Sequence, residues 1–112
     1  MALAALTLSG LAGAQAYPTK NVTLLVPFAA GSSTDIMTRL VAKGLNGGLK
    51  TSHFIVDNKP GANGTIASDV VAKARPDGYT ILVGTGTTHT QVPWMMKSLS
   101  YDPVKDFEPV AG

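Results

Sequence analysis

The sequence predicts an α/β fold built on a parallel sheet, because short strand-like stretches alternate with segments of helical spacing. The strand-like stretches lie at residues 21–27, 53–57 and 79–83, and each runs into turn-forming or polar residues. The two segments between them carry apolar residues three and four positions apart, which is the spacing of one helix face. Strands that alternate with helices pair in parallel through right-handed crossovers, and their helices cover the faces of the sheet.

The first strand and helix have the clearest boundaries. Residues 21–27 are almost continuously apolar and end at Pro27, as expected for a strand that is buried on both faces. The small-residue turn 28–35 ends in residues that cap helices. A helix is predicted after it, ending at the glycine pair 47–48, on apolar residues at helical spacing: Ile36, Met37, Leu40, Val41 and Leu45.

The later elements follow the same alternation. A second strand is predicted at 53–57, a turn-rich loop at 58–64 and a second helix marked by Ile66, Val70, Val71 and Ala74. Residues 75–78 break that helix, and a third strand is predicted at 79–83. A polar loop at 84–89 precedes a third helix that begins near Pro93. Residues 107–111 are expected to begin another strand, and Trp94, Met95 and Met96 are expected to pack in the core or between domains.

Composition narrows the function classes. Nine Lys and Arg residues and seven Asp and Glu residues are spread singly along 112 residues, which disfavours a nucleic-acid or anionic-membrane partner. The sequence has no cysteine, which excludes disulfides, thiolate metal sites and a cysteine nucleophile. The length fits one small domain.

The first 16 residues are interpreted as a signal peptide. Residues 1–13 are small and apolar, and Ala14-Gln15-Ala16 is a cleavage pattern, so the mature chain is expected to begin at Tyr17. The apolar run is too short to span a bilayer. No Lys or Arg precedes it, which leaves open that the true start lies upstream or that Met1 is internal. A buried N-terminal helix is the alternative interpretation.

Two loops are the candidate binding site. In open parallel sheets, ligands bind outside the carboxyl ends of the strands. The loops at 28–35 and 84–89 both leave such ends, run into helices and carry small or hydroxyl side chains. Helix N-termini attract anions, so the pattern predicts a carboxylate site without a formal cation. The candidate ligand-binding residues are Phe28, Ala30, Gly31, Ser32, Ser33, Thr34, Asp35, Gly84, Thr85, Thr87, Thr88 and His89.

Several of these residues have a structural interpretation as well. The serines and threonines could be ordinary helix caps. Asp35 could be a cap or first-turn residue, or it could contact a ligand amine, hydroxyl or water. His89 could donate to an anion, more strongly if partly protonated, or it could make a structural hydrogen bond to a nearby carbonyl. His53 is interpreted as a packing residue.

No catalytic, cofactor or metal motif is complete. The glycines at 84 and 86 begin a dinucleotide fingerprint, but His89 stands where its third glycine belongs. A phosphate-binding loop and a Gly-x-Ser-x-Gly elbow are both absent from the sequence. A triad of Ser32 or Ser33 with His89 and Asp35 would crowd nucleophile and acid into one turn. Two separated histidines without a carboxylate cluster predict no metal site.

Five ordered segments carry a resemblance to a known family. They are residues 17–20, 25–35 (Leu-Val-Pro-Phe-Ala-Ala-Gly, then Thr34-Asp35), 57–64 (Asp-Asn-Lys-Pro-Gly-Ala-Asn-Gly), 76–82 (Pro-Asp-Gly-Tyr-Thr-Ile-Leu) and 101–110. The chain resembles the substrate-binding proteins of the tripartite tricarboxylate transporter family, also called Bug receptors. The resemblance implies a two-domain periplasmic-binding-protein-like fold, or Venus flytrap, which is monomeric at full length. It also implies that the receptor captures small carboxylates in the periplasm and delivers them to membrane permease subunits.

The resemblance also implies which loops hold the ligand carboxylate, partly through waters, and they are the same two loops at 28–35 and 84–89. Three departures stand out: Ser32-Ser33 replaces a glycine run, residues 50–53 lack the usual Gly-Gln, and the chain ends at Gly112. Residues 17–112 are therefore expected to form an incomplete first domain, with the second lobe absent. An α/β enzyme fragment with its catalytic residues in the missing part, or an inactive truncated product, are the alternatives.

Overall fold

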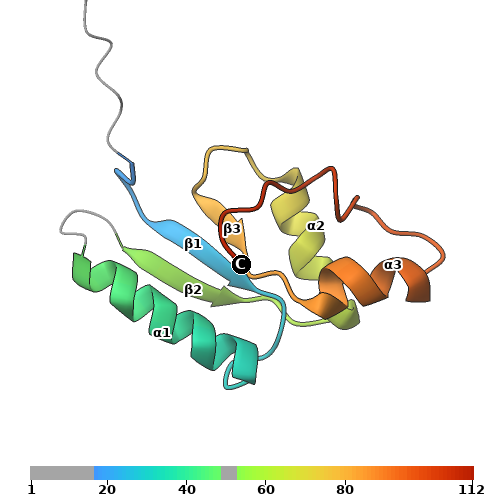
Figure 1. Ribbon diagram of the computed structural model, residues 1–112, viewed down its shortest axis with the longest axis horizontal. Helices are drawn as coiled ribbons and strands as arrows, with labels where there is room; N and C mark the ends of the chain where they lie inside the picture. The colour runs from blue at the N-terminus through green and yellow to red at the C-terminus, as the bar shows by residue number, and fades with distance from the viewer. Residues whose placement is uncertain (1–16, 49–52) are drawn as a thin grey trace, which may run out of the picture.

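A computed structural model describes residues 17–48 and 53–112 (Figure 1). The predicted signal peptide, residues 1–16, lies outside the described residues, as do residues 49–52. The elements in chain order are β1 (Val22–Val26), α1 (Ser33–Gly48), β2 (Phe54–Asn58), the 3-10 helix η1 (Ala62–Gly64), α2 (Thr65–Lys73), β3 (Thr80–Leu82), the π-helix η2 (Thr87–Gln91) and α3 (Val92–Met95).

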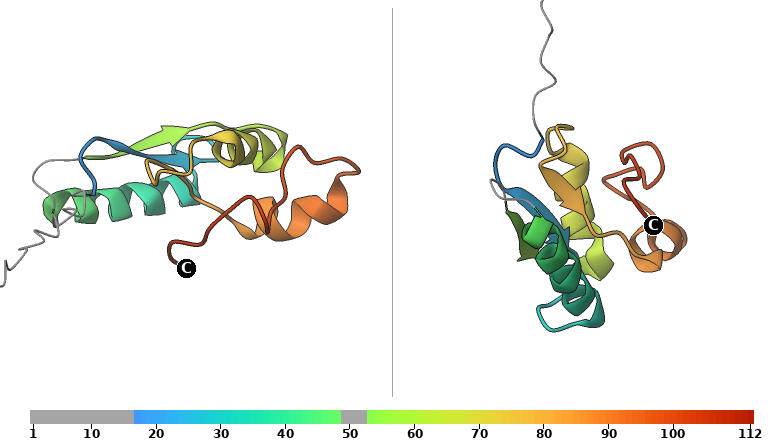
Figure 2. Two further views of the ribbon diagram at one scale, coloured as in Figure 1. Left: turned by 90° about the horizontal axis from the view of Figure 1, so that it is seen from above. Right: turned by 60° about the vertical axis from the view of Figure 1, so that its left-hand side comes forward.

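The three strands form a parallel sheet in the order β2-β1-β3, which confirms the predicted fold class. The crossover from β1 to β2 runs in one direction across the sheet, and the crossover from β2 to β3 runs in the other. Right-handed crossovers in opposite directions place their helices on opposite faces. Accordingly, α1 lies on one face of the sheet and α2 on the other (Figure 2).

The core forms around β1, where Val22, Leu25 and Val26 are almost fully buried. The helix sides that face the sheet carry small residues, Thr38 and Ala42 on α1 and Ala67 and Ser68 on α2. Small side chains let each helix axis lie close to the strands. The first strand is therefore covered on both faces, as its continuous apolar run predicts.

Two predicted boundaries were wrong. The third helical segment begins inside the predicted loop 84–89, because η2 starts at Thr87 and runs directly into α3. Residues 107–111 form no strand in the structure. Phe107 packs its ring against the rings of His89 and Tyr101 instead, with centroids 4.9 and 5.8 Å apart. This aromatic contact holds the segment in an irregular path over η2.

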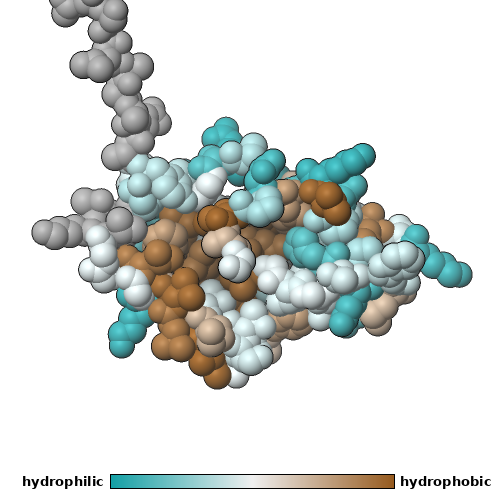
Figure 3. All heavy atoms as spheres, viewed as in Figure 1, coloured by the Kyte–Doolittle hydropathy of each residue, from teal (hydrophilic) through white to brown (hydrophobic). Residues whose placement is uncertain are grey.

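The apolar residues that predicted α1 lie on its exposed side. Ile36, Met37, Leu40, Val41 and Leu45 keep 40–62% of their surface accessible, and they form a hydrophobic patch over α1 (Figure 3). A shallow, chiefly apolar hollow of about 440 Å³ adjoins the patch between α1 and the end of β3. Trp94 is 90% exposed and Met95 is 67% exposed, so neither packs in the core of the described residues. Within those residues, the helices are all too short or too polar to cross a membrane.

The two sides of α1 should respond differently to charge. Leu40→Lys should change the free energy of unfolding by less than about 0.5 kcal/mol and should improve solubility, because Leu40 is 60% exposed. The matched substitution Ala42→Lys on the same helix should unfold the chain, because Ala42 is 5% exposed and faces the sheet. Urea unfolding followed by circular dichroism measures both. Equal destabilisation by the two substitutions would contradict the orientation of α1.

Candidate functional site

The two candidate loops leave neighbouring strand ends. β1 pairs with β3 from Thr23–Thr80 to Leu25–Leu82, so the chain that follows each strand emerges at the same edge of the sheet. β1 also lies where the crossovers reverse direction, which is the position at which open α/β sheets bind ligands. The expectation that loops 28–35 and 84–89 follow neighbouring strand ends is confirmed.

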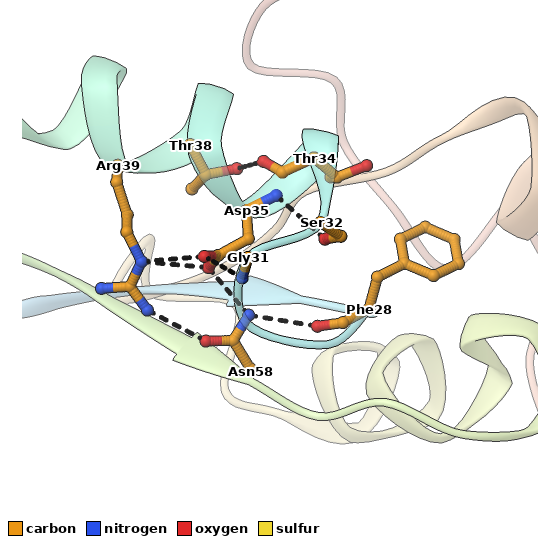
Figure 4. Close-up of polar contacts among 8 residues, drawn as sticks. All are labelled: Phe28, Gly31, Ser32, Thr34, Asp35, Thr38, Arg39 and Asn58. Carbon is orange, nitrogen blue, oxygen red and sulfur yellow. Dashed lines mark hydrogen bonds and ion pairs between the residues drawn. The ribbon is translucent and has the colours of Figure 1, made fainter.

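Asp35 organises the first loop from the first turn of α1. Its carboxylate accepts hydrogen bonds from the Gly31 amide at 2.9 Å, from Asn58 Nδ2 at 2.9 Å and from Arg39 Nε at 3.0 and 3.1 Å (Figure 4). The Arg39 guanidinium, the Gly31 amide and the Asn58 amide lower the pKa of Asp35 from 3.8 to about 2. The carboxylate is thus ionised and fully engaged, with 2% of the residue exposed. A ligand contact by Asp35 would require these bonds to break.

Asn58 supports the first candidate loop, and the sequence analysis did not identify it. It ends β2, and its Nδ2 also donates to the Phe28 carbonyl at 3.1 Å while its Oδ1 accepts from Arg39 at 3.1 Å. One side chain therefore connects β2, the loop after β1 and α1. An asparagine directly after an apolar strand was the available signal, but its three partners lie 19–30 residues away in the chain.

The start of α1 leaves donors free. Ser32 caps the helix, since its Oγ accepts from the Asp35 amide at 3.3 Å and its carbonyl accepts from the Ile36 amide at 2.9 Å. The amides of Ser33 and Thr34 precede this first helical bond and, like their hydroxyls, have no partner among the described residues. Four hydrogen-bond donors of α1 therefore remain available at the strand edge.

In the second loop, Thr85 and Thr88 bond to each other. The Thr85 amide donates to Thr88 Oγ1 at 3.0 Å, and the Thr88 amide donates to Thr85 Oγ1 at 3.4 Å, a reciprocal pattern like a capping box. Thr88 is completely buried, and its carbonyl accepts from the Tyr101 hydroxyl at 2.8 Å. Thr88 was predicted to contact ligand, but its hydroxyl holds the loop together. Thr87 is more available, because its hydroxyl makes a long, exposed contact of 3.5 Å with Gln91 Oε1.

His89 is held by its neighbours. Its Nδ1 lies 2.7 Å from Thr88 Oγ1, and its ring packs over Gly84 and against Phe107. Burial lowers the pKa of His89 below 6.5, so the ring is neutral at neutral pH. The structural hydrogen bond considered for His89 is therefore present, and its partner is a hydroxyl. An anion contact through a protonated ring has no support from this pKa shift.

The remaining residues predicted to bind ligand differ in exposure. Phe28 is partly buried, while Ala30, Gly31 and Gly84 are exposed. The hollow beside α1 includes Ser33 and Thr34, but its lining is mainly apolar and it does not reach residues 84–89. In the described ranges, no group of three or more His, Asp or Glu residues could hold a metal ion.

Known proteins share both sequence and fold with this chain. A UPF0065 protein of Bordetella bronchiseptica is 47% identical over 100 residues, which cover 89% of this chain and 30% of that relative. The chain thus spans about a third or less of the length of the relatives it matches.

Two solved structures also resemble this chain in both sequence and fold. One is described as a periplasmic transporter, with 45% identity and a TM-score of 0.82 over 86% of this chain and 32% of the other. The second is MatC from Rhodopseudomonas palustris with bound malate, with 40% identity and a TM-score of 0.74 over 84% of this chain and 32% of the other.

The family described as "Tripartite tricarboxylate transporter family receptor" matches residues 37–112, which is more than half of the chain. This match begins within α1 and covers every element after it, including the second candidate loop. The chain belongs to the family of tripartite tricarboxylate transporter receptors.

Proposed function

We propose that this chain supplies one wall of a carboxylate-binding site in a periplasmic receptor, which passes its ligand to membrane permease subunits. Membership of the receptor family supports the transport role, and the malate bound to the 40%-identical MatC supports the ligand class. The periplasmic location, with residues 1–16 as signal peptide and 17–112 as part of the first domain, belongs to the same proposal. The relatives are receptors, and we propose binding as the activity of this chain.

The observation that carries the proposal is a set of uncharged donors at two adjacent strand ends. Ser33 and Thr34 offer free amides and hydroxyls, and Thr87 offers a weakly engaged hydroxyl from the neighbouring loop. A carboxylate has two oxygens that accept hydrogen bonds, so it can bridge donors from both loops. Hydrogen bonds to a charged acceptor are stronger than those between neutral groups.

Electrostatics favours an anion at this edge. α1 is 16 residues long, and its N-terminus carries a partial positive charge beside the free amides. The guanidinium of Arg39 already forms an ion pair with Asp35 at 3.0 Å, so the Asp35 carboxylate largely neutralises its charge. We therefore propose that helix dipole and hydrogen bonds, with no lysine or arginine, hold the ligand. In this arrangement Asp35 and Thr88 support the loops, and Ser33, Thr34 and Thr87 touch the carboxylate.

Replacing Thr87 tests the ligand contact. In a chimera in which residues 17–112 replace the matching segment of MatC, Thr87→Val should weaken malate binding by about 1–2 kcal/mol, or roughly 5–30-fold, by removing one hydroxyl donor. Isothermal titration calorimetry measures the affinity. Thr90→Val is the matched control, because Thr90 is an exposed threonine of the same π-helix. Equal affinities for both variants and the unsubstituted chimera would show that Thr87 does not contact the ligand. If malate diamide bound as tightly as malate, the claim that the site binds a carboxylate would be wrong.

Replacing Asp35 tests the support of the first loop. Asp35→Asn should lower the free energy of unfolding at pH 7, because Arg39 and the Gly31 amide lose a charged partner. The pKa of Asp35 is about 2 in the folded chain and 3.8 ordinarily, so the unfolded chain binds more protons between these values. The unsubstituted chain therefore loses stability as the pH falls from about 4 to about 2, and its advantage over Asp35→Asn should shrink there.

Urea unfolding at several pH values measures this difference. Asp69→Asn is the control, since Asp69 makes an i,i+4 ion pair with Lys73 but receives no bond from a strand-end loop. Its effect at pH 7 should be smaller. A difference between Asp35→Asn and the unsubstituted chain that stays constant from pH 7 to pH 2 would contradict the role given to the Asp35 carboxylate.

A further inference from the structure

Gly64 lies where all three strand-end segments meet. It follows β2, and a Cβ built on it would lie 2.5 Å from the Thr88 methyl carbon and 3.1 Å from Pro27 Cβ. Pro27 directly follows β1, and Thr88 anchors the loop after β3. Pro27, which directly precedes the first candidate loop, and Thr88 of the second loop therefore both pack against one glycine, and this glycine lies outside the two loops.

The backbone at Gly64 cannot move away easily. Its amide donates to the Gly61 carbonyl at 3.0 Å, and its carbonyl accepts from Ser68 Oγ at 2.9 Å. Ser68, on α2, is fully buried, and Gly64 itself is buried. Any side chain at position 64 would therefore have to displace Thr88 or Pro27, since a 2.5 Å approach to a carbon atom is far inside van der Waals contact.

We propose that Gly64 is a positioning residue that sets the distance between the two loops of the proposed carboxylate site. Thr88 carries the reciprocal bonds with Thr85, and it is directly joined to Thr87 and His89. A displacement of Thr88 thus moves the Thr87 hydroxyl relative to the free donors of Ser33 and Thr34. This inference rests on the proposed function, because the distance between the loops matters only if one ligand bridges them.

Backbone conformation and steric contact can be separated at Gly64. Its φ is +87°, a left-handed value that disfavours any residue with a Cβ. Gly31 has the same φ of +87°, but a Cβ on Gly31 would meet no atom within 4 Å. Gly31→Ala therefore has the same backbone strain as Gly64→Ala without the clash, which makes it the matched control.

The test compares amide chemical shifts in ¹⁵N-labelled samples of the full 112-residue chain. Gly64→Ala should shift amides in both loops, 28–35 and 84–89, whereas Gly31→Ala should shift only those around its own loop. Adding Thr88→Ser removes the clashing methyl group and keeps the hydroxyl, so Gly64→Ala with Thr88→Ser should return residues 84–89 toward their positions in Thr88→Ser alone. Unchanged shifts at 84–89 in Gly64→Ala, or no recovery in the double variant, would overturn the inference.

A folding failure is also informative. If Gly64→Ala does not fold, a folded spectrum for the double variant supports the inference, and an unfolded one overturns it. Malate added to the same variants of the MatC chimera separates the two proposals, because the chain alone supplies only one wall of the proposed site. Malate-induced shifts at Ser33, Thr34 and Thr87 that weaken in Gly64→Ala and return in the double variant are the expected result. No malate response in the unsubstituted chimera would count against the proposed function, while the shifts measured without malate would still decide the role of Gly64.

Discussion

The position of β1 between β2 and β3 is the constraint on which the site depends. Every residue of β1 except Thr23 is buried, and the strand pairs in parallel on both sides. Because the chain crosses to β2 and then back past β1 to β3, the helices must cover opposite faces. The same reversal brings the ends of β1 and β3 together. The two polar loops therefore meet because of topology, and their side chains then determine what can bind there.

Most polar atoms of these loops serve the protein itself. Asp35, Asn58 and Arg39 fix the loop after β1, while Thr85 and Thr88 fix the loop after β3. Buried polar groups without partners are costly, so each of these bonds stabilises one loop conformation. Among the described residues of these loops, the amides and hydroxyls of Ser33 and Thr34 and the weakly engaged hydroxyl of Thr87 remain available. A rigid frame that presents few free donors is well suited to a binding protein, because little ordering is needed when the ligand arrives.

Local patterns predicted much of the fold. The apolar run of β1, the glycine pair that ends α1 and the turn residues 75–78 each identify a boundary from neighbouring residues. The orientation of α1 could not be predicted, because its apolar stripe suggests burial while Thr38 and Ala42 are the residues that face the sheet. Phe107 was likewise misread as the start of a strand, since its contact with His89 crosses 18 positions of the chain.

The candidate site, like the fold, could be predicted only in part from the sequence. The two loops were predictable, because strand ends and small polar residues are visible in the sequence. The separate roles within them were not, since Thr87 and Thr88 are identical residues that differ in burial and in hydrogen-bond partners. Asn58 and Gly64 were missed for a related reason: both act through contacts with residues 19 or more positions away.

A crystal structure of the receptor chimera with bound malate would test the central claim most directly. The account predicts one ligand carboxylate within hydrogen-bond distance of donors on Ser33 or Thr34 and of Thr87, with Arg39 still paired to Asp35. A carboxylate bound by Arg39 or by a lysine, away from the ends of β1 and β3, would contradict it.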